Sequence, residues 1–159
     1  MLTSRHLGTL ALSSSEDGTA YSATSMEIAG YVVRVTLTLR DATSFDQAAI
    51  DALDASLDAL DDVHRLVLET MGAELAVPSS TTSEFWTFHR EEVEALGNLS
   101  ATEFVARLRL ARLGLYPDGA YGAKGYLTLD YAIPEPQTDQ LLVARFASDR
   151  SWLGFAWES

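Results

Sequence analysis

The sequence predicts an α+β fold, with a largely antiparallel sheet of about six to seven strands and three helices inserted between the N-terminal and C-terminal strands. Apolar and polar residues alternate in the first third, apolar residues recur every three or four positions in the middle, and short apolar runs separated by turn signals return at the end. Strands segregated from helices are typical of α+β proteins. We expect one domain spanning residues 1–159.

The clearest strand of the first third covers residues 33–40. Its apolar residues alternate with arginines and threonines, so that one face is apolar and the other polar. This pattern is typical of an antiparallel sheet that is open to water on one side. Shorter strands are expected near residues 6–13 and 19–27, on either side of a cluster of turn-forming residues at 13–18.

Three helices follow, and each begins with a capping-box pattern, in which Ser or Thr precedes Glu or Gln by three positions. We expect the first to begin at Ser44 and to run past Leu68, the second to begin at Thr81 and end at Gly97, and the third to begin at Ser100. The first helix has an apolar stripe that predicts its buried side: Ile50, Leu53, Leu57, Leu60, Val63, Val67 and Met71.

The chain returns to strands from about Leu110, and four strands are expected in the last third, at residues 113–116, 126–131, 140–146 and 152–157. Pro117, Asp118 and Gly119 form a strong turn signal after the first of these strands, and Asp149 with Arg150 fits a turn before the last. We expect Gly119 to take a positive φ, which glycine adopts without steric cost.

The composition indicates a folded protein without disulfides. Hydrophobic residues make up 47% and charged residues 21%, and there is no cysteine to form a disulfide, a thiolate zinc site or a thiol nucleophile. No segment approaches the roughly 20 apolar residues of a membrane helix, and the N-terminus lacks an apolar signal core, so we expect a cytoplasmic protein.

The net charge of −12 limits the partners. An acidic surface repels both nucleic acids and anionic membranes, so we expect neither as a partner. The same charge favours fast encounter with a basic protein, although acidity also serves simply to keep a protein in solution.

No motif predicts catalysis, a metal site or a cofactor. The three histidines, His6, His64 and His89, lack metal-ligand spacing. The glycines around Lys124 depart from a phosphate-binding loop, because a P-loop requires Gly-Lys followed by Ser or Thr at the start of a helix. We therefore expect no cofactor and no enzymatic activity.

The acidic residues of the C-terminal hairpins are the basis of one alternative. Paired carboxylates can carry general acid–base catalysis when they converge in a cleft, and the sequence leaves open whether Asp118, Asp130 and Asp139 do so. A turn accounts for Asp118, and the polar side of an alternating strand accounts for Asp130. The alternative function is thus a small carboxylate-dependent hydrolase.

The first helix carries a row of four aspartates, here called the acidic ribbon: Asp51, Asp54, Asp58 and Asp61. Each follows a residue of the apolar stripe by one position, which places the ribbon about 100° around the helix from the buried side. It is either a solvated shoulder or a surface that binds a protein partner, and we take the second as the hypothesis. Small residues on the opposite shoulder, at positions 49, 52, 56 and 59, would permit close packing and make a homodimer or a self-associating structural protein a further alternative.

The C-terminal third also resembles a known family. The segments 113–119 (LGLYPDG), 127–131 (LTLDY), 138–143 (TDQLLV) and 157–159 (WES) are similar to blocks of a family of small acidic bacterial domains of unknown function. Proteins of this type are found among candidate immunity proteins of polymorphic toxins. The resemblance implies a binding protein that masks a basic partner, and it assigns no catalytic residue.

Overall fold

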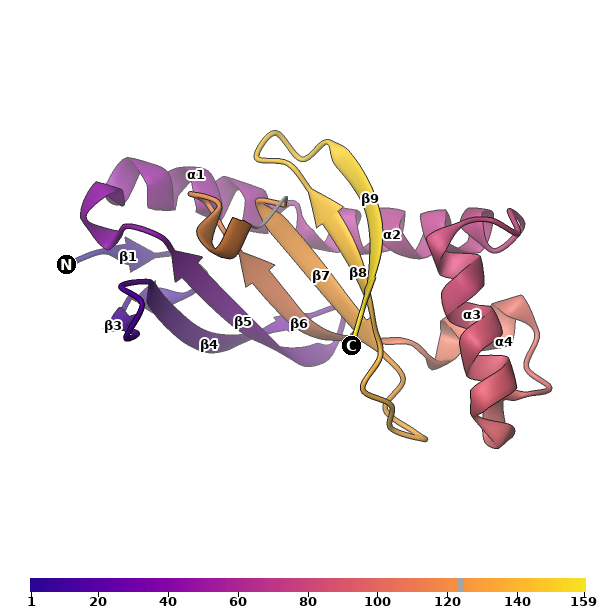
Figure 1. The fold of residues 1–159 in the computed structure, drawn as a ribbon. Coiled ribbons are helices and arrows are strands. Elements are labelled where there is room, and N and C mark those ends of the chain that lie inside the picture. Colours follow the sequence, from indigo (N-terminus) through magenta and orange to yellow (C-terminus); the bar gives the residue numbers. More distant parts are fainter. Residues whose placement is uncertain (123–124) are drawn as a thin grey trace.

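A seven-stranded sheet forms the centre of the fold, with the strands in the order β3-β4-β5-β6-β7-β8-β9 (Figure 1). The structure is a computed structural model and describes residues 1–122 and 125–159. The predicted α+β class and the number of strands are confirmed. The strands are β3 (Ser13–Ser14), β4 (Ala20–Ile28), β5 (Tyr31–Leu39), β6 (Arg109–Leu115), β7 (Leu127–Ala132), β8 (Leu141–Phe146) and β9 (Trp152–Glu158), and a separate hairpin consists of β1 (Thr3–Ser4) and β2 (Gly8–Thr9).

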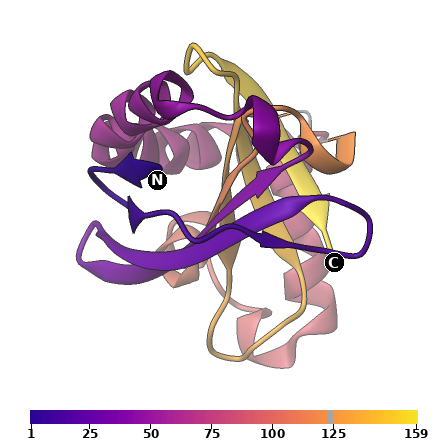
Figure 2. The ribbon, with the colours of Figure 1, turned by 90° about the vertical axis from the view of Figure 1, so that its left-hand side faces the viewer.

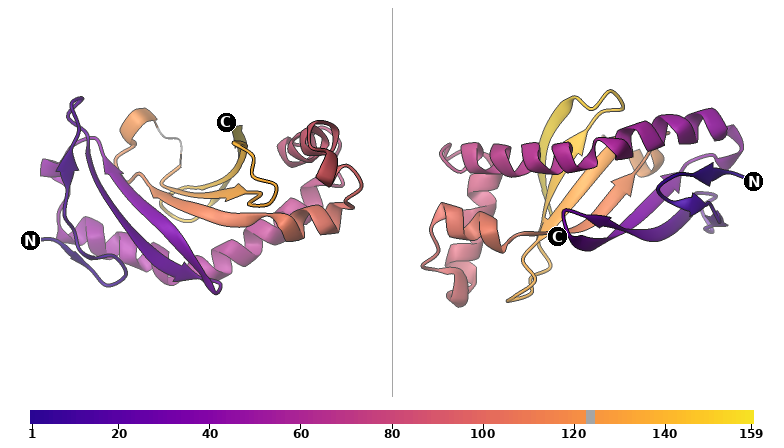
Figure 3. Two further views of the ribbon diagram at one scale, coloured as in Figure 1. Left: turned by 90° about the horizontal axis from the view of Figure 1, so that it is seen from below. Right: turned by 180° about the vertical axis from the view of Figure 1, so that it is seen from behind.

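The helices all lie between β5 and β6 in the chain, as predicted. The described residues form four α-helices, α1 (Gln47–Asp58), α2 (Leu60–Glu74), α3 (Thr81–Glu92) and α4 (Ala101–Arg107), and three 3-10 turns, η1 (Ala42–Ser44), η2 (Glu94–Leu96) and η3 (Ala120–Gly122). In Figure 3, α1 and α2 follow each other along one face of the sheet, and α3 and α4 lie beyond the end of α2. α3 packs against β9.

The prediction of three helices was wrong by one, because the first predicted helix is interrupted at Ala59. The backbone there has φ −93° and ψ 6°, outside the helical range, and its N–H bonds to the oxygen of Ser56 in a tight turn. The helix expected to end at Gly97 ends earlier, at Glu92, because the next residue is extended.

Two of the three predicted helix starts were displaced. Asp46, not Ser44, caps α1: its carboxylate accepts a backbone N–H of the first turn at 2.9 Å. Ser80 caps α3 one residue before the predicted Thr81. The capping box at Ser100 is present as predicted, with the glutamate three residues later returning the second hydrogen bond. Ser, Thr and Asp are nearly equivalent as caps, so the pattern alone does not select among neighbours.

One pair of neighbouring strands, β5 and β6, is parallel, and the other pairs of the sheet are antiparallel. The helices between these two strands explain the exception. After β5 the chain travels back along the sheet through the helices and enters β6 in the same direction as β5, which a hairpin turn cannot achieve.

The two faces of the sheet differ in polarity. The apolar side of β5 is buried together with the stripe of α1 and α2, as the alternation predicted. On β6 to β9 the residues that alternate with the core include Arg112, Thr128, Asp130 and Arg145. We call this polar side the open face. No helix within residues 1–122 and 125–159 is long and apolar enough to cross a membrane.

Candidate functional site

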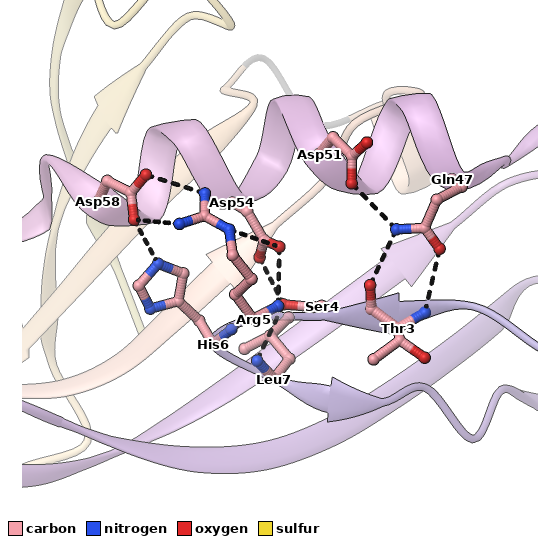
Figure 4. A network of polar contacts seen from close by, with 9 residues as sticks. All are labelled: Thr3, Ser4, Arg5, His6, Leu7, Gln47, Asp51, Asp54 and Asp58. Atoms are coloured by element: carbon pink, nitrogen blue, oxygen red, sulfur yellow. Dashed lines mark hydrogen bonds and ion pairs between the residues drawn. The ribbon is translucent and has the colours of Figure 1, made fainter.

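The hairpin β1/β2 packs against α1 (Figure 2), and hydrogen bonds join it to the acidic ribbon. Gln47, in the first turn of α1, holds the hairpin through two hydrogen bonds to Thr3. The Thr3 N–H donates to Gln47 Oε1 at 3.3 Å, and Gln47 Nε2 donates to the Thr3 carbonyl at 2.9 Å. This contact places the following residues, Ser4 to Leu7, directly beside the ribbon (Figure 4).

Asp54 has a structural position at the centre of this contact. Its side chain is 2% exposed, and its carboxylate accepts hydrogen bonds from the Ser4 hydroxyl and, at 2.8 Å, from the Arg5 N–H. The Ser4 oxygen accepts the N–H groups of His6 and Leu7 at 3.1 and 2.9 Å. The expectation that all four aspartates are exposed was therefore wrong for Asp54, because the N-terminal hairpin covers it.

Asp58 forms the closest ion pairs of the ribbon, and Asp54 forms a longer one, with its Oδ2 3.8 Å from Arg5 Nε. On Asp58, Arg5 donates from Nη1 to Oδ1 at 3.3 Å and from Nη2 to Oδ2 at 2.9 Å, and His6 Nε2 lies 2.7 Å from Oδ1. The hydrogen bond from Arg5, followed by that from His6, holds the pKa of Asp58 below its usual value. The carboxylate remains 48% exposed, so water screens these pairs. The arrangement is the two-bonded fork in which guanidinium recognises carboxylate.

The two ends of the ribbon remain at the surface. Asp51 is exposed and accepts a hydrogen bond from Gln47 Nε2 at 3.0 Å. Asp61 is exposed, and no ion pair in the described part of the chain includes it. In the ribbon, Asp54 is thus buried, Asp58 has the closest ion pairs, and Asp51 and Asp61 are the two exposed ends. Partner binding by these residues stays a prediction.

The hairpin carboxylates occupy three separate places. Asp118 accepts the backbone N–H groups of Arg40 and Asp41 at 2.7 and 2.9 Å, and so joins the predicted turn to the end of β5. Asp139 is exposed and accepts a hydrogen bond from its neighbour Gln140. Asp130 lies on the open face. The three do not converge in one cleft.

Asp130 is buried, although the alternation predicted a solvated position. It is 1% exposed and pairs with Arg112, whose Nε lies 2.6 Å and whose Nη2 lies 2.5 Å from Oδ2. Burial raises the pKa of Asp130, and the charge of Arg112 opposes that rise. The pair lines a cavity of about 380 Å³ together with Glu158, the only other carboxylate among its lining residues.

The histidines have structural partners. His64 Nδ1 lies 2.7 Å from the hydroxyl of Tyr131, and burial lowers the pKa of His64. His89 is buried, lies 2.8 Å from the Phe85 carbonyl oxygen, and has a pKa that burial also lowers. Within residues 1–122 and 125–159, no group of three His, Cys, Asp or Glu side chains could hold a metal ion. Lys124, which was considered for a phosphate loop, lies outside the described residues.

A second cavity, of about 550 Å³, lies between α2, α4 and the start of β6. Its walls are mainly aliphatic, with Leu68, Val105 and Leu110 among them, and His64 is its polar edge. The turn between β4 and β5 also lines it, through Ile28, Ala29 and Tyr31. Nothing in the sequence predicted this cavity, because its lining comes from segments that are distant in the chain.

No family model, no curated protein and no solved structure matches this chain.

The contact between the N-terminus and the ribbon was missed by the sequence reasoning, although one signal for it exists. Residues 41–64 contain no lysine or arginine, and Arg5 is the first basic residue of that kind in the chain. The acidic segment has no lysine or arginine of its own to balance its negative charge, so an arginine from elsewhere in the chain can form the ion pair.

Proposed function

We propose that this protein is a non-enzymatic protein-binding domain, which recognises a cationic partner through the exposed part of the acidic ribbon. The observation that supports this most directly is the Arg5–Asp58 contact, with two N–H···O bonds of 3.3 and 2.9 Å. It is an intramolecular example of the recognition that we propose, since the ribbon already binds a guanidinium. An immunity-type protein that masks a basic partner would use the same chemistry.

The charge distribution supports the same proposal. Asp51 and Asp61 are exposed on either side of the occupied centre, and the whole chain carries a net charge of −12. Exposed charges of one sign accelerate encounter with a partner of the opposite sign, and this acceleration weakens as salt shortens the Debye length. The proposed role of the two ends is therefore mainly kinetic.

The positions of the other carboxylates support a role without catalysis. Hydrolysis by paired acids requires two carboxylates that can exchange protons with the substrate. Asp118 is committed to backbone N–H groups, and Asp130 is committed to Arg112. The alternative of a carboxylate-dependent hydrolase would depend on Asp130 and Glu158 alone, because they share a cavity.

The test compares two variants with the same change in charge. Asp51→Asn/Asp61→Asn removes both free ends of the ribbon and leaves the buried Asp54 intact. Glu91→Gln/Glu94→Gln removes two exposed acids near the end of α3, away from the ribbon. A partner is first isolated from the native host or from the products of neighbouring genes, and its association rate is then measured at about 20 and 150 mM salt.

We expect the ribbon variant to associate about tenfold more slowly than the control variant at low salt, with a smaller difference at high salt. Equal rates for the two variants would show that only total charge matters and would refute the ribbon as the recognition surface. Turnover of ester, phosphate or glycoside substrates that disappears in Glu158→Gln would favour the hydrolase instead.

A further inference from the structure

Arg145, on β8, has no partner for its charge on the open face. Its Nε atom is buried and makes no hydrogen bond to any residue that the structure describes. No ion pair within residues 1–122 and 125–159 includes it. A buried N–H without an acceptor lowers stability, and a charged one does so more strongly. The rest of the guanidinium belongs to a residue that lines a cavity, and that side of Arg145 is open to a ligand.

The surroundings of Arg145 form a cavity that could hold a small group. The open-face cavity, of about 380 Å³, is lined by Arg112, Tyr116, Thr128, Asp130, Arg145 and Glu158, among others. Strand register places Thr128 of β7 and Gly154 of β9 on either side of Arg145. The guanidinium therefore has a small hydroxyl residue on one side and no side chain on the other.

The floor of the cavity is shaped by a close approach of Tyr116 to the sheet. A Cβ at Gly114 would lie 2.7 Å from Cε2 of Tyr116 and 2.5 Å from Oγ1 of Thr128, so only glycine permits this packing. Tyr116 is one of the residues that line the cavity, and its side chain ends in a hydroxyl. It is a second donor that faces the same cavity.

The charges of the cavity select the ligand. Arg112 is neutralised by Asp130, with which it forms two contacts. Among the described lining residues, Arg145 is the cation without an ion pair, while Glu158 adds a negative charge at the exposed end of β9. A planar carboxylate matches the guanidinium fork. A phosphate would bring up to two negative charges toward Asp130 and Glu158, and like charges this close repel each other.

We propose that the open-face cavity binds a carboxylate group, which Arg145 holds through its guanidinium and Tyr116 through its hydroxyl. The group can belong to a free organic acid or to the C-terminus of a peptide, since both present the same two oxygens. This site lies on the sheet and uses none of the aspartates of the acidic ribbon, so it does not depend on the function proposed above.

The test follows the Nε–Hε signal of Arg145 by NMR in the full-length protein during titration with sodium acetate, with sodium chloride at equal ionic strength as the reference. We expect a saturable shift with a Kd in the millimolar range, because so small a ligand offers few contacts. Arg145→Gln should abolish saturation, monitored on the backbone signals of β7 and β8. Arg65→Gln, which changes an exposed arginine of α2 away from the cavity, should bind acetate like the wild type.

Arg145→Lys provides a second variant in case the glutamine variant does not fold. It keeps the charge and loses the planar fork, and we expect affinity to fall about tenfold. Tri-alanine with a free C-terminus, its C-terminal amide, succinate and inorganic phosphate distinguish the sources. Tighter binding of the free peptide than of acetate, with no binding of the amide, identifies a peptide C-terminus. Tighter binding of succinate identifies a free acid.

Three results would overturn the proposal. A shift that rises linearly with acetate and equals that with chloride means that there is no site. Binding of acetate that persists in both Arg145 variants places the site elsewhere. Phosphate that binds more tightly than acetate means that the cavity selects for charge and not for a carboxylate.

Discussion

The Arg112–Asp130 pair provides a quantitative test of the reasoning about the open face. Asp130 is 2% exposed in its side chain, whereas the side chain of Arg112 is 43% exposed. Removal of the arginine by Arg112→Met would leave a carboxylate in the sheet without its counter-charge. Loss of one partner of a fully buried pair costs about 3–5 kcal/mol, and the exposure of Arg112 reduces this, so we expect a loss of about 2–4 kcal/mol at pH 7.

The pH dependence of this loss follows from the direction of the pKa shift. Burial raises the pKa of Asp130 above its usual 3.8, and removal of Arg112 takes away the cation that most directly opposes that rise. As the pH falls through the raised pKa, the folded variant binds a proton before the unfolded chain does, and folding is stabilised. The destabilisation should therefore be largest near pH 7, decrease as the pH falls, and be smallest below about pH 4.

The assay is urea denaturation of the wild type, Arg112→Met, Asp130→Leu and the double variant at pH 7 and pH 5. The double variant should recover most of the stability lost in Arg112→Met, because it removes the isolated charge. Arg65→Met is the matched control. Its partner Asp62 lies 2.7 Å away, but their side chains are 70% and 80% exposed, so we expect less than about 0.5 kcal/mol. A loss in Arg112→Met that equals the control, or that is unchanged between the two pH values, would mean that Asp130 is not an isolated buried charge in this variant.

Two further predictions concern helix and turn residues. Asp46→Ala should lower the free energy of unfolding by about 1 kcal/mol and Ser44→Ala by less than half as much, because only Asp46 caps α1; equal urea midpoints for the two would contradict this assignment. Gly119→Val should destabilise the protein by about 1 kcal/mol or more, because Gly119 has a φ of +68°. Gly72→Ala in α2 should stabilise it by up to about 1 kcal/mol, because an added Cβ there meets no atom within 4 Å. Thermal melting compares the stability of both glycine variants with that of the wild type. An unchanged midpoint for Gly119→Val would contradict the predicted strain at the turn.

The features that were predicted correctly depend on neighbours in the sequence. The alternation of residues 33–39 predicted the buried side of β5, and the positive φ of Gly119 followed from the turn signal. The capping box at Ser100 was also correct. In each case the residues that determine the conformation lie within a few positions of one another, so the pattern can be recognised without knowledge of the fold.

The features that were missed depend on which segments become neighbours in space. Asp54 was expected to be exposed because nothing near it in the sequence covers it. The N-terminal residues Ser4 and Arg5 bury it in the folded protein. Asp130 was expected to be solvated, because its burial requires Arg112 from the adjacent strand. The periodicity of a strand gives the side on which a residue lies, and it does not indicate how many large side chains share that side.

The single parallel pair in the sheet has a consequence for how the chain closes. Every other strand of the sheet pairs with its neighbour in the chain, so that β3 to β5 and β6 to β9 are two meanders made of local contacts. Among the described strands, the pairing of residues 34–37 with residues 112–115 is the one that joins the two meanders. Most of the entropy lost on closing the sheet is therefore lost at one place, the pairing of β5 with β6, which is called the seam here. The four helices between β5 and β6 shorten the distance that this part of the chain must close. The seam divides the protein into a half whose strands precede the helices and a half whose strands follow them, and the open-face cavity belongs entirely to the second half.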